Sequence, residues 1–337
     1  MSADRRALHD FIARHRSFLL TTHVNPDGDG LGSEVALGLW LRSRGKTVRI
    51  VNDSVIPAAF DFLARHLPME SFDPESAERH FDEADAVIVL DTSNRQRVGR
   101  LAALFDRHPV PVAVIDHHVS HAGFGQVNVI EPEASATGEI VYDLLREAGE
   151  PITPEIAEAL YVALMTDTGS FRYSNTDTHA HRMAAELLGH GLDPQRLHSQ
   201  VHSHASAGRL RFFGEVLSAL ELDCDGRLVI LEAAPEQFAR HGLVGADTDG
   251  LVDLPRTIAG VEAVVLFSEV EPGKVKVSLR STGRVAIDGV ASRHGGGGHM
   301  HAAGVLLRGS RADARQRVLP ELRALIVAAT PTGSPVA

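Results

Sequence analysis

Histidine and aspartate residues gather at four points in the first half of the chain. They stand in the stretch THVNPDGDG, at the end of VIVLD, in the triplet of IDHH and in MTDTG. Carboxylate oxygens suit Mg²⁺ and Mn²⁺, and imidazole nitrogens shift the preference toward transition metals. Two imidazoles and four carboxylates can hold a pair of such ions. The predicted metal ligands are His23, Asp27, Asp29, Asp91, His117 and Asp167.

Each cluster taken alone also has a purely structural interpretation. PDGDG is a good turn sequence, because its glycines permit tight turns. Asp91 could cap a helix, Asp167 could stand at a helix end, and a pair such as His117-His118 is more often surface or core than ligand. The four clusters, however, all stand at the ends of predicted strands or helices. That coincidence favours a metal site in which one loop feeds two adjacent ions.

Apolar runs and helical patterns alternate from residue 17 onward, in the order SFLLTTH, LGSEVALGLWLRSRG, TVRIVND, AVIVLDTS, RVGRLAALFDRH and VPVAVIDHH. This alternation is typical of βαβ units and predicts an α/β fold with a parallel sheet and helices on both faces. The runs that end at His23, Asp91 and Asp116 are continuously apolar, as expected for strands buried on both faces. Ligands bind beyond the carboxyl ends of such strands, so the polar residues stand where a site is expected.

A second strand pattern begins after residue 211, in RLVILEAA and in VEAVVLFSEVEPGKVKVSLRS, where Pro272-Gly273 predicts a turn. The segment before it is polar, rich in His and Ser, and has no long strand pattern. We therefore predict a catalytic metal-binding domain over 1–192, a connector over 193–211, a smaller α/β domain over 212–330 and a loose tail over 331–337.

Composition indicates a globular protein and narrows its partners. Of the 337 residues 44% are hydrophobic and 23% charged, which is typical of packed domains. The N-terminus lacks the apolar core of a signal peptide, and no apolar run approaches the ~18–20 residues that span a bilayer, so we expect a cytoplasmic protein with no membrane partner. The single cysteine, Cys224, excludes a cysteine-rich zinc site. The net charge of -11 disfavours broad binding of long nucleic acid.

The motifs THVNPDGDGLGS, VLDTSN, IDHH and MTDTGSF, in this order, resemble those of the DHH phosphoesterase superfamily. The C-terminal motifs SLRS and GGGGHMHAAG resemble its DHHA1 partner domain. Together these motifs cover nearly the whole chain. The compact length and the stretches DTGSF and LVDLPR are most similar to the bacterial nanoRNase/pAp phosphatase (NrnA-type) group, whereas RecJ-type exonucleases usually carry extra domains.

The resemblance implies a division of labour among the metal ligands. It implies two divalent ions, Mn²⁺ by preference, with Mg²⁺ as the alternative. Asp91 would bridge the two ions, since a carboxylate can accept one cation at each oxygen. One ion would be held by His23 and Asp27, and the other by Asp29, His117 and Asp167.

The catalytic groups that the same resemblance implies are Asp91, Asp116 and His118. In a two-metal site, with ions about 3.5–4 Å apart, a bound water loses a proton near neutral pH and attacks phosphorus in line. His118, as an imidazolium, would stabilise the developing charge or protonate the leaving oxygen. Asp116 would orient His117 or a neighbouring backbone group. No covalent intermediate on a Ser or Thr side chain is needed.

Substrate-binding residues are expected in the second domain. A run of glycines lets backbone N–H groups approach a phosphate, and an arginine offers a planar fork that suits phosphate. A glycine run by itself also fits a flexible loop or the end of a helix. We expect the second domain to grip one end of a short nucleotide while the first cleaves the adjacent phosphoester. The expected residues are Arg280, Ser281, Gly296, Gly297, Gly298 and His299.

The function that the resemblance implies is hydrolysis of short RNA oligonucleotides to mononucleotides, with 3′-phosphatase action on pAp as a further expected activity. The closest alternative is hydrolysis of a linear or cyclic dinucleotide such as pApA or c-di-AMP. A manganese-dependent pyrophosphatase shares the first-domain motifs but lacks the GGGGH loop. From a different class, a catalytically silent nucleotide-binding module would be expected to have lost a carboxylate that is intact here. The oligomeric state stays open, with a homodimer as one expectation.

Overall fold

The computed structural model describes residues 2–92, 94–118, 123–243, 248 and 250–329, and for His299 it describes the backbone alone. The chain divides into two compact units, Met1–His204 and Ala205–Ala337. The predicted loose tail lies outside the described residues. The domain borders at 192 and 212 stay predictions.

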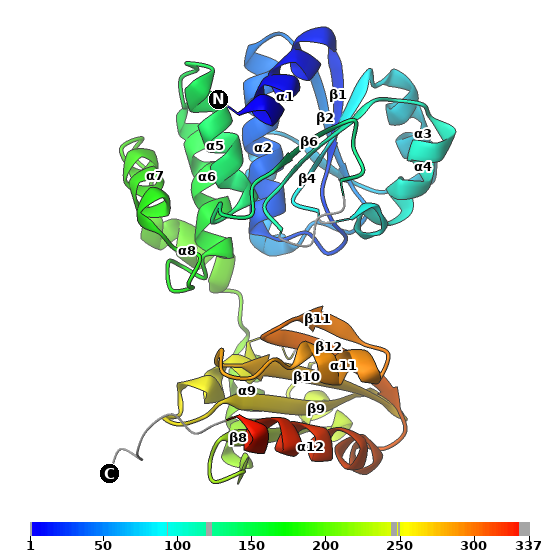
Figure 1. Cartoon of the computed structure of the whole chain (residues 1–337), viewed down its shortest axis with the longest axis vertical. Helices are drawn as coiled ribbons and strands as arrows, with labels where there is room; N and C mark the ends of the chain where they lie inside the picture. Colours follow the sequence, from blue (N-terminus) through cyan, green and yellow to red (C-terminus); the bar gives the residue numbers. More distant parts are fainter. Residues whose placement is uncertain (1, 93, 119–122, 244–247, 249, 330–337) are drawn as a thin grey trace. The chain divides into compact units, whose positions relative to one another are not determined.

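A six-stranded parallel sheet forms the centre of the first unit (Figure 1). Its strand order is β3-β2-β1-β4-β5-β6. Its strands are β1 (Ser17–Thr21), β2 (Thr47–Asn52), β3 (Met69–Ser71), β4 (Ala86–Leu90), β5 (Val112–Asp116) and β6 (Val127–Ile130). Every residue of β4 is buried, because apolar side chains on both sides of a central strand pack against helices. The predicted parallel sheet is confirmed.

Helices cover both faces of this sheet, as predicted. Leu20 and Ile88 point to one face and pack against α1, α2, α5 and α6. Leu19 and Val87, their strand neighbours, point to the other face and pack against α3, η3 and α4. The helical segments of the unit are α1 (Ala3–Arg14), α2 (Gly28–Ser43), η1 (Ala58–Phe60), η2 (Leu63–Arg65), α3 (Pro74–Glu83), η3 (Arg95–Ala103), α4 (Leu104–Arg107), α5 (Thr137–Glu147), α6 (Pro154–Asp167), α7 (Thr178–Leu188) and α8 (Pro194–His202).

The segment RVGRLAALFDRH differs from the continuous helical pattern that its sequence predicts. It forms most of the 3₁₀ segment η3 and the short helix α4. Gly99 has a φ of 69° and interrupts the regular geometry. A side chain at Gly99 would lie 2.5 Å from Cγ of Asp53, and the backbone N–H of Arg100 donates to Oδ1 of Asp53 (2.7 Å) instead of continuing a helix. Tertiary packing against Asp53 thus overrides the local pattern.

The strand order places a natural binding position in this unit. The order reverses at β1, because β2 and β3 lie on one side of it and β4 to β6 on the other. Ligands of open α/β sheets bind beyond the carboxyl ends of the strands at such a reversal. The loop that carries His23 follows β1, and Asp91 directly follows β4. Two of the predicted clusters therefore flank the reversal point.

A second six-stranded sheet, in the order β11-β12-β10-β9-β8-β7, forms the smaller unit. Its pairings are antiparallel except for β8 with β9. One face packs against α11 and α12, and the other, over β8 and β9, against α9, α10 and η4. The predicted turn at Pro272-Gly273 joins β9 to β10. The elements are α9 (Ala207–Ser218), β7 (Glu221–Asp223), β8 (Leu228–Ala233), α10 (Pro235–Arg240), η4 (Leu251–Thr257), β9 (Ala263–Glu271), β10 (Lys274–Ser281), α11 (Asp288–Arg293), β11 (Gly297–His299), β12 (Ala302–Arg308) and α12 (Arg311–Ala328).

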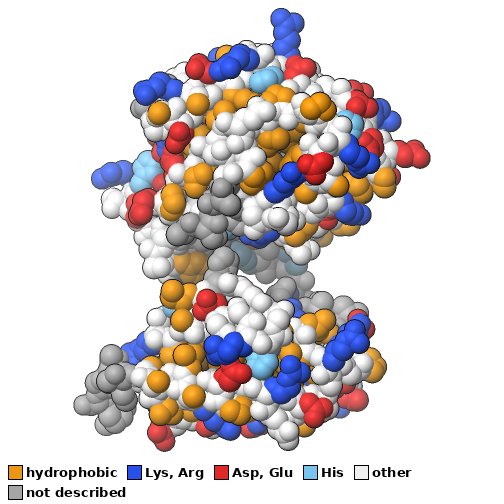
Figure 2. Space-filling model, turned by 45° about the vertical axis from the view of Figure 1, so that its right-hand side comes forward, with side chains coloured by type: hydrophobic (Ala, Val, Ile, Leu, Met, Phe, Trp, Pro, Cys, Tyr) orange, Lys and Arg blue, Asp and Glu red, His pale blue; other side chains and the backbone are white. Residues whose placement is uncertain are grey.

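Charged side chains of both signs are mixed on one face of the protein (Figure 2). On the face shown in Figure 2, Lys and Arg side chains alternate with Asp and Glu side chains over both units and form no continuous basic strip. Among the described residues, no helix combines the length and the apolar character that crossing a membrane requires.

Candidate metal centre

His23 and Asp27 come from the loop between β1 and α2. The Nδ1 of His23 donates to the carbonyl oxygen of Val24 (2.8 Å), which leaves Nε2 as the nitrogen for a metal. This Nε2 lies 3.7 Å from Oδ2 of Asp27 and 3.5 Å from Oδ2 of Asp91. The other oxygen of Asp27 caps α2 by accepting the backbone N–H groups of its first turn (3.1 and 3.2 Å). The helix cap thus aims one carboxylate oxygen at His23.

Asp29 is buried in the first turn of α2, with 1% of its surface exposed. Its two oxygens accept the backbone N–H groups of Thr137 (2.7 Å) and Gly138 (2.9 Å) at the start of α5. Two helix N-termini therefore meet at one carboxylate, where their dipoles favour negative charge. Burial, then the neighbouring carboxylates of Asp91 and Asp167, nevertheless raise the pKa of Asp29 well above its usual value. The carboxyl group of Asp29 is thus fixed by two hydrogen bonds, and a nearby cation would stabilise its ionised form.

Asp91 occupies the centre of the cluster. It has a φ of 55°, a left-handed conformation that costs a non-glycine residue about 1–3 kcal/mol and is often found at functional sites. Its Oδ2 faces Nε2 of His23, and its Oδ1 lies 3.7 Å from Nε2 of His117. Burial opposes its ionisation, but His23, His118 and His117 together lower the pKa of Asp91. Each oxygen of this carboxylate thus faces a different imidazole.

His117 turns the same nitrogen toward three carboxylates. Its Nδ1 donates to the carbonyl oxygen of Ala134 (3.1 Å). Its Nε2 lies 3.8 Å from Oδ2 of Asp29, 3.7 Å from Oδ1 of Asp91 and 3.5 Å from Oδ2 of Asp167. A backbone carbonyl therefore sets the tautomer of His117 and leaves Nε2 for a metal.

Asp116 orients His118 in this structure. Asp116 is fully buried at the end of β5, and its Oδ1 accepts a hydrogen bond from Nδ1 of His118 (2.7 Å). The sequence predicts that Asp116 orients His117 or a neighbouring backbone group, but in the structure the carbonyl of Ala134 orients His117. Side chains two positions apart along an extended segment point to the same side, which brings His118 onto Asp116. Burial opposes protonation, but Asp116 and Asp91 raise the pKa of His118 above its ordinary value.

Asp167 is the last residue of α6 and closes the cluster. The side-chain amide of Asn175 donates to Oδ2 (3.3 Å) and to the carbonyl oxygen (3.2 Å) of Asp167. Burial is the largest cause that raises the pKa of Asp167 to about 6; the charge of His117 opposes it and Asp91 adds to it. This carboxyl is thus shifted in the same direction as that of Asp29.

The predicted ligands converge in two adjoining groups: Asp91 belongs to one, and its Oδ1 lies 3.7 Å from Nε2 of His117 in the other. In each group one ligand atom per residue lies within 4.8 Å of the others. A further group of this kind joins Asp91, His117 and His118. Burial opposes charge on His23, yet Asp27 and Asp91 raise the pKa of His23 to about 10. The raised pKa values of His23, Asp29 and Asp167 show that these groups hold protons that a cation could replace. Their oxygen and imidazole ligand atoms fit a pair of divalent cations. The groups are His23–Asp27–Asp91 and Asp29–His117–Asp167.

Thr137 belongs to the centre, although the sequence does not indicate it. Its backbone N–H binds Asp29, and its hydroxyl donates to Oδ1 of Asp91 (3.2 Å). In the sequence it is one threonine at the start of a helical pattern. It lies 108 positions from Asp29, so only the packing of α5 against α2 reveals the contact.

A pocket of about 220 Å³ lies on the sheet of the second unit. Lys276, Ser278 and Arg280 of β10 line it together with Gly297. The Nη1 of Arg280 donates to the carbonyl of the preceding residue (3.0 Å). Arg280 and Gly297 are thus brought together, as expected for a shared site. The sequence does not single out Lys276 and Ser278, although the alternation of side chains along the strand KVKVSLRS places them on the same face as Arg280.

Of the other residues expected to bind substrate, Ser281, Gly296 and Gly298 are not among the described residues that line this pocket. Ser281 is on the opposite face of β10, is 1% exposed, and accepts the N–H of Gly283 (3.1 Å); successive strand residues alternate, so it does not join Arg280 in the pocket. The N–H of Gly296 donates to the carbonyl of Ala291 (2.9 Å) and so ends α11. At Gly298 (φ 142°) a Cβ would lie 2.4 Å from the carbonyl oxygen of Ala302. The side chain of His299 lies outside what the structure describes.

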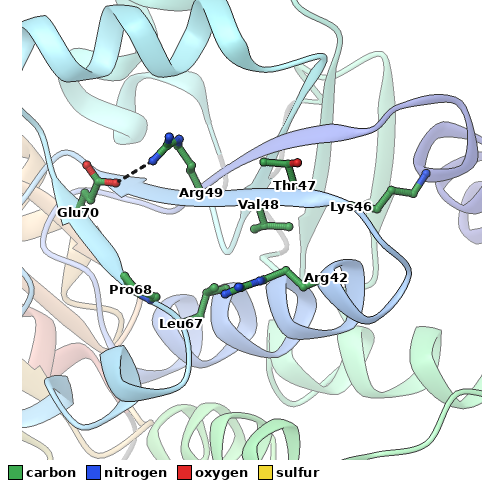
Figure 3. A pocket seen from close by; sticks show the side chains of 8 residues that line it. All are labelled: Arg42, Lys46, Thr47, Val48, Arg49, Leu67, Pro68 and Glu70. Carbon is green, nitrogen blue, oxygen red and sulfur yellow. Dashed lines mark ion pairs between the residues drawn. The ribbon is translucent and has the colours of Figure 1, made fainter.

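A further hollow, of about 350 Å³, lies beside the start of β2 (Figure 3). Its lining includes the cations Arg42, Lys46 and Arg49. Lys46 donates to two backbone carbonyls (2.9 and 2.6 Å), and Arg49 pairs with Glu70 (3.7 Å). Since two of these three cations already serve the fold, we assign no ligand to this hollow.

Comparisons with known proteins identify the family. Residues 17–164 match the "DHH family, N-terminal domain" and residues 229–328 match the "DHHA1 domain". The chain is 35% identical over 307 residues to the "Bifunctional oligoribonuclease and PAP phosphatase NrnA" of Thermus thermophilus, covering 90% of this chain and 88% of that protein. A solved structure of an exopolyphosphatase-related protein from Bacteroides fragilis matches with a TM-score of 0.90 at 27% identity, covering 96% of this chain and 98% of that one.

A more distant relative is the "Cyclic-di-AMP phosphodiesterase GdpP" of Geobacillus thermodenitrificans, 26% identical over 317 residues. The match covers 89% of this chain and 46% of that protein. The resemblance seen in the sequence motifs is confirmed. The chain belongs to the DHH family of metal-dependent phosphoesterases and carries a DHHA1 domain after its DHH domain.

Proposed function

We propose that this protein hydrolyses short oligoribonucleotides to mononucleotides and removes the 3′-phosphate of pAp. The observation that carries the proposal is the geometry at Asp91, whose two oxygens face His23 and His117 in two adjoining ligand groups. The substrate class is that for which the NrnA protein of Thermus thermophilus is named. A local basic pocket on an acidic chain favours short substrates over long polymers.

The proposed cofactors are two Mn²⁺ ions, with Mg²⁺ as the alternative. His23 and Asp27 would hold one ion, Asp29, His117 and Asp167 the other, and Asp91 would contact both. When bound, such a pair activates a water molecule and neutralises charge on the phosphate oxygens. The Thr137 N–H and hydroxyl would keep Asp29 and Asp91 oriented for this task.

His118 has the proposed role of holding a proton for the reaction. Its Nδ1 binds Asp116, which favours the imidazolium form. An imidazolium beside the metal ligands can stabilise charge on the phosphate or give its proton to the leaving oxygen. Asp116 would act through His118, as the residue that fixes the direction of the ring.

The second unit has the proposed role of substrate binding. Lys276 and Arg280 line one pocket, with Nε of Arg280 3.7 Å from Oδ1 of Asp253. Gly297 has open space where a side chain would stand. Backbone at such a glycine is accessible to a phosphate group. We propose that this pocket binds the part of the nucleotide that is not cleaved.

A product assay tests the proposed function. The protein with Mn²⁺ is given end-labelled di-, tri- and longer RNA, pAp, pApA, c-di-AMP and pyrophosphate in parallel. We expect mononucleotides from the shortest RNAs and AMP from pAp. Hydrolysis of pyrophosphate with no action on any nucleotide would contradict the proposal.

The second candidate is hydrolysis of cyclic or linear dinucleotides. The likeness to the GdpP protein, named for c-di-AMP, supports it. The same assay separates the two candidates: a dinucleotide phosphodiesterase would act on c-di-AMP or pApA faster than on tri- and longer RNA. Preference for c-di-AMP over all linear substrates would replace our first proposal with this one.

A further inference from the structure

Glu34 is a buried carboxyl group near the metal centre that belongs to none of the ligand groups. It lies on α2, one turn after Gly30, and is fully buried. It is near enough to His23 and Asp91 for their charges to act on it. Buried carboxyl groups are rare because leaving water is costly for them. Its presence at this position therefore asks for an explanation.

A single side-chain amide connects Glu34 to the loop that carries His23. The Nδ2 of Asn52, at the end of β2, donates to Oε2 of Glu34 (2.8 Å). The Oδ1 of the same amide accepts the backbone N–H of Thr22 (2.9 Å) and lies 3.4 Å from the hydroxyl of Thr21. Thr22 directly precedes His23. The chain of bonds runs from α2 through β2 to the peptide next to a metal ligand, and all its residues are buried.

The close approach of α2 to Thr22 reinforces this connection. A Cβ at Gly30 would lie 2.4 Å from Oγ1 of Thr22, so the absence of a side chain allows the helix to reach the strand end. Gly30 and Glu34 are four positions apart and share one face of α2. The start of α2 therefore contacts the peptide before His23 at two successive turns, once by packing and once through Asn52.

This network weakens the fold more than an apolar core would. Over the described residues, Oε1 of Glu34 and Oγ1 of Thr22 are buried and have no hydrogen-bond partner. Unpaired buried polar atoms cost free energy that a methionine of similar volume would avoid. Burial raises the pKa of Glu34 to about 8, although the bond from Asn52 opposes the shift, so the carboxyl is mostly protonated at neutral pH.

We propose that Glu34 and Asn52 are positioning residues that hold the Thr22–His23 peptide and thereby set the affinity of the site for its divalent ion. The inference rests on the proposed metal site and extends it beyond the residues that touch the ion. Fixing a ligand through its outer partners changes metal affinity by about 10–100-fold in other sites. The network would thus stabilise the geometry of His23 at some cost to the fold as a whole.

The test compares Glu34→Met, Glu34→Gln and Asn52→Ala in the full chain. Mn²⁺ dissociation constants come from titration calorimetry or electron paramagnetic resonance, and exchange of the Thr22 amide comes from hydrogen–deuterium exchange. Glu34→Gln can keep the bond from Asn52 and copies the protonated form. Glu158→Gln, which alters a largely buried carboxyl paired with Arg196 (3.2 Å), is the matched control.

We expect Glu34→Met to raise the Mn²⁺ dissociation constant about 10–100-fold, to speed exchange at Thr22 and to leave the thermal midpoint equal or higher. Asn52→Ala should weaken binding similarly, while Glu34→Gln and Glu158→Gln should stay close to the unaltered chain. Unchanged binding in a folded Glu34→Met protein overturns the inference, and so does equal weakening by Glu34→Gln. If Glu34→Met fails to fold, Asn52→Ala decides by the same criteria.

The outcomes separate this inference from the proposed function. If the unaltered chain hydrolyses RNA with Mn²⁺ while Glu34→Met and Asn52→Ala bind Mn²⁺ normally, only the positioning role is wrong. If the unaltered chain binds no divalent ion, both are wrong.

Discussion

At the scale of single residues, Asp91 makes contacts with both proposed ligand groups and has an unusual backbone conformation. Its carboxylate faces an imidazole on each side, its hydrogen bond from Thr137 fixes one oxygen, and its backbone adopts a left-handed conformation. Strain of this kind persists only where surrounding bonds enforce it. The residue is therefore the most sensitive point for a test of the bridging role.

We expect Asp91→Ala to lower turnover on the best substrate by at least about 10²-fold, because changing a residue that only hydrogen-bonds to a metal ligand can already have an effect of that size. Asp106→Ala, which removes an exposed aspartate that pairs with Arg95 (2.6 Å), should leave turnover nearly unchanged. Both are measured by initial rates at saturating substrate and Mn²⁺. Near-normal turnover of Asp91→Ala would rule out the bridging role even though the family is established.

Lys276 allows a second test at this scale. It lines the pocket of the second unit beside Arg280, whereas Lys274, two positions earlier, pairs with Glu271 (2.6 Å) at the β9–β10 turn. We expect Lys276→Met to raise KM for short RNA and pAp about 10-fold, as loss of one charge-assisted contact of roughly 1.4 kcal/mol implies, with a smaller change in kcat. Lys274→Met is the matched control, and an equal rise in its KM would show that the pocket has no special role.

At the scale of elements, the start of α2 contributes a residue to each of the two proposed ligand groups. Asp27 caps the helix, Asp29 lies in its first turn, and Gly30 brings it onto Thr22. The carboxyl ends of the three strands β1, β4 and β5, the starts of α2 and α5 and the end of α6 meet here, so the proposed ligands lie at or beside the ends of regular elements. Sites built on rigid elements keep their geometry better than sites on loops.

We expect Gly30→Ala to displace this helix start. The added methyl group would lie 2.4 Å from Oγ1 of Thr22, and overpacking of this kind costs about 1–3 kcal/mol of unfolding free energy. Mn²⁺ affinity should fall with it. Gly214→Ala in α9, where the new Cβ has no neighbour within 4 Å, should be neutral or stabilising by up to about 1 kcal/mol. Chemical denaturation of both variants checks this, and an equal free energy of unfolding for the two would contradict it.

At the scale of the whole molecule, the centre links stability to pH and to metal. The pKa of His23 is raised from 6.5 to about 10 and that of Asp167 from 3.8 to about 6. In both cases the folded chain binds more protons than the unfolded chain between the two pKa values. The free energy of unfolding therefore falls as pH rises from 6.5 to about 10 for His23 and from 3.8 to about 6 for Asp167. The stability that His23 contributes is complete below pH 6.5 and is lost as pH passes about 10. Asp91, whose pKa is lowered, stays ionised throughout.

We therefore expect the thermal midpoint of the metal-free protein to fall as pH rises from mildly acidic to alkaline. Mn²⁺ should reduce or reverse the trend, because cations take the place of the protons. At a hundred times its dissociation constant the ion adds about 2.7 kcal/mol. Thermal scans with EDTA and with Mn²⁺ at several pH values measure both effects. A metal-free midpoint that rises over this range would contradict the charge balance described here.

Local patterns in the sequence were enough to predict much of this protein. Continuous apolar runs ending in His or Asp identify buried parallel strands with polar carboxyl ends, and the order of those runs predicts the α/β fold. His23, Asp91 and His117 converge because they follow the carboxyl ends of parallel strands, which lie at one edge of a sheet. Asp27 and Asp29 join them from the start of α2, and Asp167 from the end of α6. Strand burial and the capacity to bind a metal both depend on residue type and spacing, so short segments of the sequence are enough to predict them.

Tertiary structure alone decided which partner each polar group meets. Asp116 binds His118 while the carbonyl of Ala134 binds His117. Asp29 meets Thr137 across 108 positions, and Glu34 meets Asn52 across 18. Such contacts depend on how helices pack across a sheet, and no local pattern encodes them. The packing of β10 also decides which of its residues can bind substrate. Lys276 lines the pocket, whereas Ser281 lies on the buried face, because the side chains of a strand alternate and only packing determines which face is open.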